Sequence, residues 1–434
     1  MDAFLWFLAF IGALLLFMAT RAPVAVGMGL IGALGSIAFV STGALTQLAS
    51  IAYSQSASFV LVVVPLFVLM GEVIAFSGMG AALYRAASLW LRRLPGGLAA
   101  ATVLACAGFA SVCGSSPVTA ATIGAVSVPE MIRNGYDKRL ALGTTAAGGT
   151  LGILIPPSIP MILYGVITET SIGKLFLAGI LPGLMMAGLL ILTVALQVLW
   201  KPEIAPKLPE PANRSERWRA LGEVGPVIVL AVGIIGSIYG GIATPTEAGA
   251  VGAAGAILIA TLMGRMRLAL LKTSLDITVK TTAMFLLLLI GGLFSSFVLA
   301  RLGVPQGMSE MLTSLSAQPW MVIVMINLML IVLGMFLDPM SILVIVAPIF
   351  LDAVRDIGYD PVWFGVIMTI QIEIAAITPP VGFNLFVLKS VGGEAFQMKD
   401  VVSGALIFIV PLMLGIVLLV MFPEIALWLP RFVQ

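Results

Sequence analysis

The sequence predicts an all-α membrane protein that crosses the bilayer many times. Of its 434 residues, 60% are apolar and only 10% are charged, whereas a soluble protein carries about a quarter charged residues. Stretches without any charged side chain recur along the chain, and many approach the roughly 20 residues that a helix needs to cross a bilayer. These stretches predict about ten crossings and two shorter hairpins.

Composition also excludes several kinds of site. The chain contains no histidine, so the usual metal ligand and the usual proton shuttle are both missing. No phosphate-binding glycine–lysine signature occurs, and no cluster of acids or nucleophiles lies within an apolar stretch. We therefore expect no enzyme and no nucleic-acid partner. Cys106 and Cys113 share one apolar stretch and are expected to be buried.

Basic residues predict the orientation of the chain, because they favour the cytoplasmic side of short loops. With the N-terminus outside, all the main basic groups fall inside. These are Arg21, Arg92, Arg93, the proline-rich linker 201–219, Arg265, Arg267, Lys272, Lys389 and Lys399. We expect the linker to be a cytoplasmic surface loop that only joins the two halves.

The segment CGSSPVTAATIG, 113–124, interrupts a charge-free stretch that runs from Leu94 to Pro129. From Val118 to Ile132 there is room for only about 22 Å of helix, which is less than a hydrocarbon core of about 30 Å. Basic residues flank the stretch on both sides. We therefore predict a re-entrant hairpin that enters from the cytoplasm and turns near Ser115 and Ser116.

A second hairpin is predicted around LDPMS, 337–341, between the apolar run 320–337 and a short second leg that ends at Asp352. Its flanks are mixed in sign and lean acidic, which favours entry from the opposite face. Each hairpin is followed by an apolar segment with a double proline, AAGGTLGILIPPS at 146–158 and IEIAAITPPVGFN at 372–384. Broken helices at matching positions of two halves are typical of inverted repeats in secondary transporters.

Non-helical backbone at membrane depth is tolerated where it is buried in protein or lines a cavity. Free N–H groups of a broken helix attract a carboxylate, and free C=O groups with nearby hydroxyls coordinate Na⁺. We predict two or more Na⁺ sites and a substrate site between the hairpin tips. The predicted cation ligands are Ser115, Ser116, Gly149, Thr150 and Gly152 at the first site, and Asp338, Met340, Ser341, Ile377, Thr378 and Pro379 at the second. The predicted substrate residues are Gly114, Ser116, Pro156, Pro157, Pro380 and Asn384.

Four acids lie within or beside the predicted spans. Intramembrane acids are functional candidates, and for Glu373 and Asp338 a functional and a structural role stay equally open. Glu72 and Glu247 are expected at the interface, solvated. Whether Glu373 or Glu247 takes part in coupling is not decided by the sequence.

These features divide the chain into five regions. Scaffold helices occupy 1–93, and the first hairpin and broken helix occupy 94–170. A second group of scaffold helices with the linker occupies 171–300, the second hairpin and broken helix occupy 301–390, and a C-terminal helix occupies 391–434.

The hairpin motifs carry a family resemblance. The segment GSSPVTAATIGAVSVPEMIRNGYDKRLALGTTAAGGTLGILIPPSIPMILYG and the segment ITPPVGFNLFVL resemble the large membrane subunit of tripartite ATP-independent periplasmic (TRAP) transporters. VPLFVLMGE at 64–72 and ATPTEAGAVGA at 243–253 extend the resemblance over nearly the whole chain. It implies an elevator-type carrier that is driven by a Na⁺ gradient, with Na⁺ bound at the hairpin tips and the opposing unwound segments.

The same resemblance implies the partners. It implies a small four-helix membrane subunit as a separate chain, and a soluble periplasmic protein that delivers an organic acid such as a C4-dicarboxylate or a sialic acid-like carboxylate. The location is then the bacterial inner membrane. The alternative is a stand-alone Na⁺/anion symporter that needs no binding protein. TEAGAVGAAGA at 246–256 faintly resembles the cytoplasmic coupling loop of permeases in ATP-driven importers, but the predicted topology places it near the outer surface at the start of a span, which argues against such an importer.

Overall fold

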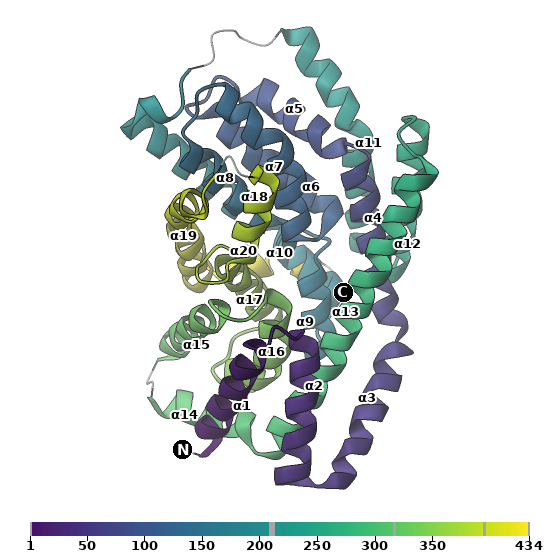
Figure 1. Cartoon of the computed structure of the whole chain (residues 1–434), viewed down its shortest axis with the longest axis vertical. Helices are drawn as coiled ribbons and strands as arrows, with labels where there is room; N and C mark the ends of the chain where they lie inside the picture. The colour runs from purple at the N-terminus through teal and green to yellow at the C-terminus, as the bar shows by residue number, and fades with distance from the viewer. Residues whose placement is uncertain (1, 208–212, 316–317, 394–395, 433–434) are drawn as a thin grey trace.

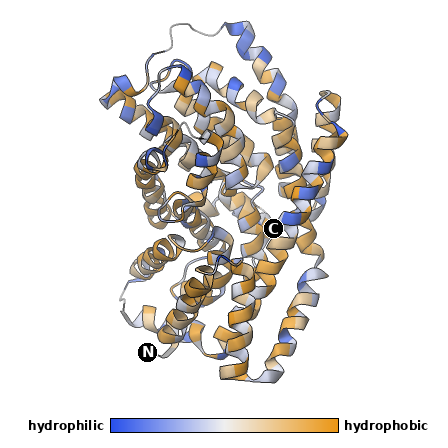
Figure 2. Ribbon diagram, viewed as in Figure 1, coloured by the Kyte–Doolittle hydropathy of each residue, from blue (hydrophilic) through white to orange (hydrophobic). Residues whose placement is uncertain are grey.

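The computed structural model describes residues 2–207, 213–315, 318–393 and 396–432. Every regular element in these ranges is helical, as the sequence predicts. Six of the helices in this part of the chain are long and apolar enough to cross a membrane: Phe59–Phe76, Ile172–Trp200, Arg214–Tyr239, Pro245–Leu262, Leu268–Arg301 and Met398–Met421. Figure 2 shows hydrophilic residues gathered at the upper end of the molecule, above largely hydrophobic helices.

The N-terminal region packs on long helices from the middle of the chain. It contains α1 (Asp2–Met18), α2 (Val24–Gly35), α3 (Thr46–Ser56), α4 (Val63–Phe76) and α5 (Met79–Leu91). The middle region contains α10 (Ile172–Trp200), α11 (Arg214–Tyr239), α12 (Pro245–Leu262), α13 (Leu268–Arg301) and α14 (Val304–Leu315). Helix α13 lies against α2 and α4, and α12 lies against α4 (Figure 1).

Small residues allow the close approach of α2 and α13. The Cα atom of Gly291 lies 3.8 Å from a Cβ built at Gly29, and Ser295 Oγ donates a 2.6 Å hydrogen bond to the carbonyl of Met28. Small side chains at helix contacts are typical of membrane proteins, because packing and interhelical hydrogen bonds replace the hydrophobic drive in lipid.

Two units with the same order of helices make up most of the rest of the chain. The first unit consists of α6 (Gly97–Cys113), α7 (Ser116–Arg133), α8 (Lys138–Thr150), the short turn η4 (Leu151–Ile153) and α9 (Ile159–Thr168). The second consists of α15 (Pro319–Gly334), α16 (Pro339–Asp356), α17 (Pro361–Ala376) and α18 (Phe383–Gly392). Figure 1 places α6, α7 and α8 in the upper half, together with α18, and α15, α16 and α17 in the lower half, together with α9. The chain ends with α19 (Met398–Met421) and α20 (Glu424–Leu427).

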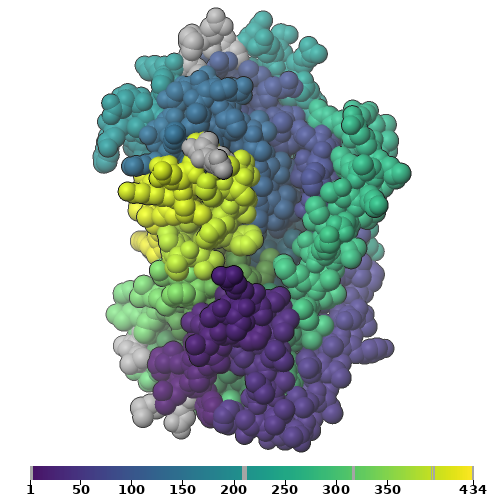
Figure 3. Space-filling view, in the orientation of Figure 1, coloured from purple at the N-terminus to yellow at the C-terminus, as the bar shows by residue number. Residues whose placement is uncertain are grey.

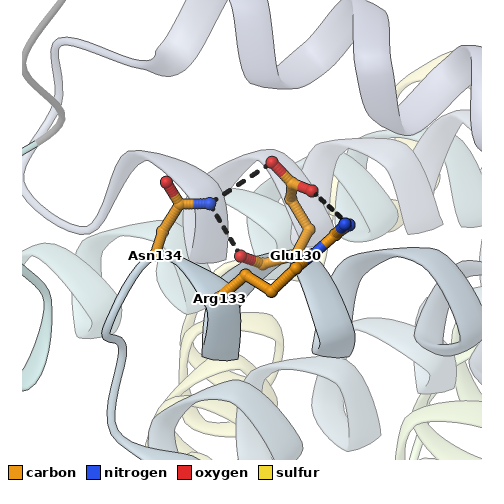
Figure 4. A network of polar contacts seen from close by, with 3 residues as sticks. All are labelled: Glu130, Arg133 and Asn134. Atoms are coloured by element: carbon orange, nitrogen blue, oxygen red, sulfur yellow. Dashed lines mark hydrogen bonds and ion pairs between the residues drawn. The ribbon is translucent and has the colours of Figure 1, made fainter.

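The C-terminal end of helix α7 carries a small polar network (Figure 4). The carboxylate of Glu130 accepts a 2.8 Å hydrogen bond from Arg133, and Asn134 donates to both the carbonyl and the carboxylate of Glu130. Charged groups therefore mark where the second leg of the first hairpin leaves the apolar core. That leg spans 18 residues, or about 27 Å of helix, and is longer than the 15-residue leg that the sequence predicts.

Part of the predicted linker is helical. Residues 208–212 lie outside the described residues, but Arg214–Arg219 form the first turns of α11. The expectation of a loop through residue 219 is therefore wrong. Asn213 caps this helix, since its side chain accepts a 3.3 Å hydrogen bond from the backbone N–H of Ser215, and asparagine is a favoured residue at that position.

Candidate functional site: two hairpin tips against two broken helices

The first hairpin turns where the sequence predicts. Gly114 ends α6 with a positive φ of 66°, a conformation that glycine adopts without a Cβ penalty. Ser115 is extended and precedes α7. Glycine at position 114 therefore ends α6. Pro117, which suits the first turn of a helix, favours the start of α7 directly after Ser115.

The first break faces this tip. A Cβ atom at Gly114 would lie 2.7 Å from the carbonyl oxygen of Pro157, and a Cβ atom at Gly152 would lie 2.6 Å from the carbonyl oxygen of Ser115. The same carbonyl accepts a 2.8 Å hydrogen bond from Thr119 Oγ1. Backbone therefore meets backbone between tip and break, with no room for side chains.

The helix opens later than the sequence predicts. Gly149 and Thr150 are still α-helical, and the turn η4 carries the chain through Gly152 to Ile153 before the break begins. Gly149 provides space, because a Cβ there would lie 2.5 Å from Cβ of Ala120. Gly149 is thus a packing residue in this conformation, and the prediction that it opens the helix is wrong. The α-helix ends at Thr150, and Gly152 lies in the 3₁₀ turn that follows.

The hydroxyl of Thr150 is buried and donates a 2.6 Å hydrogen bond to the carbonyl of Ala147. A hydroxyl oxygen that donates its only proton keeps its lone pairs. Thr378 does the same at the second break, where it donates a 2.6 Å bond to the carbonyl of Ile374. Both oxygens are therefore free to coordinate a cation.

The second hairpin turns at Met335–Asp338 and restarts at Pro339. The carboxylate of Asp338 caps α16: Oδ2 accepts 3.2 Å hydrogen bonds from the N–H groups of Met340 and Ser341, and Oδ1 accepts one from Ser341 Oγ. The capping role of Asp338, left open by the sequence, is thus observed. Ser341 is fully buried, whereas Met340 is partly exposed.

The second break begins at Ile377, the residue after α17, as predicted. It faces its own hairpin tip, because the N–H of Val381 donates a 3.3 Å hydrogen bond to the carbonyl of Met335. Among the described residues, no hydrogen bond joins Asp338, Met340 or Ser341 to Ile377, Thr378 or Pro379. The peptide bonds Pro156–Pro157 and Pro379–Pro380 are both cis.

A side-chain hydrogen bond joins the two units near the first hairpin tip. Asn384, at the start of α18, donates a 2.7 Å hydrogen bond from Nδ2 to Oγ of Ser116, at the start of α7. Both residues are buried, and Oδ1 of Asn384 has no partner among the described residues. Of the predicted substrate residues, Ser116 and Asn384 meet directly, Gly114 and Pro157 are in backbone contact, Pro156 is buried, and Pro380 is exposed.

The helix that follows each break packs on the other unit, and this arrangement is called the exchange of α9 and α18 below. Helix α9, from the first unit, packs on α16 and α17 of the second, and α18, from the second unit, packs on α7 and α8 of the first. Figure 3 shows the yellow C-terminal residues directly against blue residues of the first unit. This exchange brings the N-terminal ends of α7 and α18 together at the Ser116–Asn384 contact.

Sequence reasoning missed two contributors to the first tip. Thr119 lies one helical turn after Ser115, and that spacing is the signal by which it can be found. Gly71 of α4 is the other, because a Cβ there would lie 2.9 Å from the carbonyl oxygen of Cys113. Glu72 beside it is buried, contrary to expectation, whereas Glu247 is exposed as expected and forms a capping box with Thr244.

An apolar cavity of about 370 Å³ lies between α1 and α15 and is lined by Phe4, Phe7, Leu8, Ile11, Leu15, Leu328, Met329, Val332, Leu333, Phe336 and Leu337. It has no polar group that recognises a carboxylate, so it is not the predicted substrate site.

Comparison with solved structures shows the fold. The chain is similar to the YdaH transporter of Alcanivorax borkumensis, with a TM-score of 0.57 at 14% identity over 97% of this chain and 98% of that one. It is therefore an all-helical, multi-span membrane protein with a transporter fold.

Sequence comparison is more specific. The chain is 36% identical over 405 residues to the C4-dicarboxylate TRAP transporter large permease protein DctM of Pseudomonas aeruginosa, and the match covers 93% of each protein. It is 33% identical over 415 residues to the isethionate TRAP transporter permease protein DctMQ of Oleidesulfovibrio alaskensis, covering 94% of this chain and 64% of that protein.

A family model described as the DctM component of tripartite ATP-independent periplasmic transporters matches residues 11–425. This match spans both hairpins, both breaks and the helices that frame them, and it identifies a transporter permease rather than an enzyme. The chain belongs to the DctM family, the large permease component of bacterial TRAP transporters.

Proposed function

We propose that this chain is the membrane subunit of a Na⁺-coupled, ATP-independent uptake system for a small organic acid. The observation that carries the proposal is the pair of hairpin tips that lie against broken helices, joined by the Ser116–Asn384 hydrogen bond. Relatives with this family's permease are named for C4-dicarboxylate and for isethionate, so the substrate class is a small organic anion.

The N-terminal ends of α7 and α18 suit the anion. Helix N-termini carry free N–H groups and a positive dipole end, which attract a carboxylate. The amide of Asn384 and the hydroxyl of Ser116 add polar groups at the same place. The proposed substrate site is therefore at this junction, with the double prolines 156–157 and 379–380 behind it.

The C-terminal ends of the broken helices suit the cation. Carbonyl groups at the end of a helix lack intrahelical partners, and Na⁺ takes such oxygens. The first proposed site consists of Ser115, Ser116, Thr150 and Gly152, where Gly152 packs on the carbonyl of Ser115. The second proposed site consists of Asp338, Met340, Ser341, Ile377, Thr378 and Pro379. The lone pairs of Thr150 and Thr378 support both sites.

The exchange of α9 and α18 between units supports an inverted repeat that enters the membrane from both faces. We propose that the two units move together as an elevator against the frame of α2, α4, α12 and α13. The location is the inner membrane, with the N-terminus on the periplasmic side.

The partners are a periplasmic binding protein and a small membrane subunit. The relative DctMQ is longer than this chain, and the match covers 64% of it. We propose that a small four-helix membrane subunit works together with this permease, and that a soluble protein delivers the substrate.

The test is uptake by sealed proteoliposomes that contain this chain and its small subunit, with succinate and isethionate as probes. Replacement of Na⁺ by choline at fixed pH is expected to abolish uptake, and so is omission of the binding protein. Uptake that is unchanged in choline would exclude Na⁺ coupling, and uptake without the binding protein would favour a stand-alone symporter.

A further inference from the structure

Glu373 is a buried acid in the second unit. It lies in α17, four residues before Ile377, and is completely buried. Neither carboxylate oxygen has a hydrogen-bond partner among the described residues. By contrast, the neighbouring polar residue Gln371 donates a 2.8 Å hydrogen bond to the carbonyl of Asn327.

No charged side chain compensates this carboxyl group. Helix α17 packs against α8, α9, α10, α15, α16, α18, α19, α20 and η4. The titratable and charged groups on these elements are Lys138, Arg139, Tyr164, Lys174, Asp338, Asp352, Arg355, Asp356, Lys389, Lys399, Asp400 and Glu424. None of them forms an ion pair or hydrogen bond with Glu373.

Several of these groups lie at the far end of α17. Tyr164 donates a 2.7 Å hydrogen bond to the carbonyl of Pro361, the first residue of the helix, and Pro361 is about 18 Å from Glu373 along the helix axis. Arg355, in the last turn of α16, and Asp360, which caps α17, belong to the same end. Asp338 already accepts the capping bonds of its own hairpin tip.

An isolated buried carboxylate is costly, so such a group takes up a cation or becomes neutral. Na⁺ needs several oxygen ligands around the carboxylate, and among the described residues no polar group makes a hydrogen bond with either oxygen of Glu373. A single proton needs only one oxygen. The surroundings of Glu373 therefore favour a proton over Na⁺.

We propose that Glu373 is a proton-binding site, and that its bound proton keeps α17 packed in this conformation, so that alkaline pH inhibits the transporter. The site is distinct from the two proposed Na⁺ sites. Only the consequence for uptake rests on the proposed function; the bound proton itself does not.

The sign of the effect follows from linkage. An acid that is neutral in the folded state and ionised in the unfolded state loses stabilising effect as the pH rises. For one proton, the unfolding equilibrium constant changes by up to about tenfold per pH unit.

The experiment measures thermal unfolding of the purified protein in lipid nanodiscs between about pH 6 and about pH 9, a range in which a single-proton effect is visible. The unfolding midpoint of the wild type is expected to fall as the pH rises. Glu373→Gln, which is isosteric and always neutral, is expected to flatten this dependence. Glu310→Gln, which changes an exposed carboxylate of α14, is expected to behave as the wild type.

A second measurement tests the proposal even if the Glu373→Gln variant does not fold. The infrared carbonyl band of a protonated carboxyl group is expected in the wild type at neutral pH and absent in Glu373→Gln, or in Glu373→Met where the Gln variant is unstable. Absence of this band from the wild type would overturn the proposal, whether or not either variant folds.

Two further results would overturn the proposal. One is a pH dependence of unfolding that is identical in wild type and Glu373→Gln. The other is stabilisation of the wild type by NaCl at fixed pH, relative to choline chloride, that Glu373→Gln removes, because this would assign Na⁺ to the site. Neither measurement needs transport, so a failure here is separate from a failure of the proposed Na⁺-coupled uptake.

Discussion

The two hairpin–break units have the same order of helices but close to different degrees. In the first unit tip and break meet backbone to backbone, through Gly114 and Gly152, and the prolines 156 and 157 are buried. In the second unit Thr378 and Pro379 are partly exposed and Pro380 is exposed. The repeated feature is thus the order of helices, whereas the packing around the two tips differs.

The chemistry of the two tips differs as well. The first tip offers only hydroxyl, amide and carbonyl groups, from Ser115, Ser116, Thr150 and Asn384. The second has a carboxylate, Asp338, which caps α16. If both hold Na⁺, one site is neutral and the other is negatively charged, so the second is expected to attract a cation more strongly over a distance.

The prediction with the largest expected effect concerns whether the two hairpins enter the membrane from opposite faces. Cysteines at the exposed positions Lys138 and Lys399 are expected to react only with a reagent added from the cytoplasm, and a cysteine at exposed Asp352 only from outside. The measurement is labelling with a membrane-impermeant maleimide, added to spheroplasts for the outer side and to inside-out membrane vesicles for the cytoplasmic side. Labelling of positions 138 and 352 from the same side would rule out the inverted repeat.

A second prediction tests the tight closure of the first unit. Gly152→Ala is expected to destabilise the protein by about 1–3 kcal/mol, the usual cost of overpacking a close-packed site, because the new Cβ meets the carbonyl of Ser115. Gly188→Ala is the matched control, since nothing lies within 4 Å of a Cβ there. Equal thermal unfolding midpoints for the two variants would contradict the close packing described above.

A third prediction compares the hydroxyls. Ser116→Ala and Thr378→Ala are each expected to raise the half-saturating Na⁺ concentration for uptake by roughly 5- to 150-fold, which corresponds to about 1–3 kcal/mol for a lost buried polar contact. Uptake is measured against Na⁺ concentration at matched membrane levels. Curves that superimpose on that of the wild type would leave these hydroxyls with a packing role alone.

The smallest expected effect concerns Asp338. Asparagine is also a good helix cap, so Asp338→Asn is expected to keep the unfolding temperature and to raise the half-saturating Na⁺ concentration by less than about tenfold, through loss of the charge alone. Asp338→Ala removes the cap as well and is expected to cost about 0.5–2 kcal/mol of stability. A much larger rise in the Asn variant would show that the carboxylate binds the cation directly.

The sequence predicted the positions of both tips and both double-proline breaks, because glycine, proline and a capping aspartate determine local backbone conformation. It did not predict that Gly149 and Thr150 remain helical, since a glycine pair breaks a helix or permits close packing depending on what lies opposite, here Ala120. The burial of Glu72 was missed because it, too, depends on which helices pack opposite, and the local sequence does not show this. The Ser116–Asn384 contact depends on the exchange of α9 and α18, which no local pattern encodes.

The exchange of α9 and α18 also constrains how the protein is made. The partner of Ser116 at the first tip lies 268 residues further along the chain, so the first hairpin is complete in sequence long before the ribosome has produced α18. During that interval the ends of α7 and α8 lack the helix that covers them, and the hydroxyl of Ser116 lacks the amide of Asn384 that donates to it. The first hairpin must therefore remain adaptable, or be held by other proteins, until the last part of the chain enters the membrane.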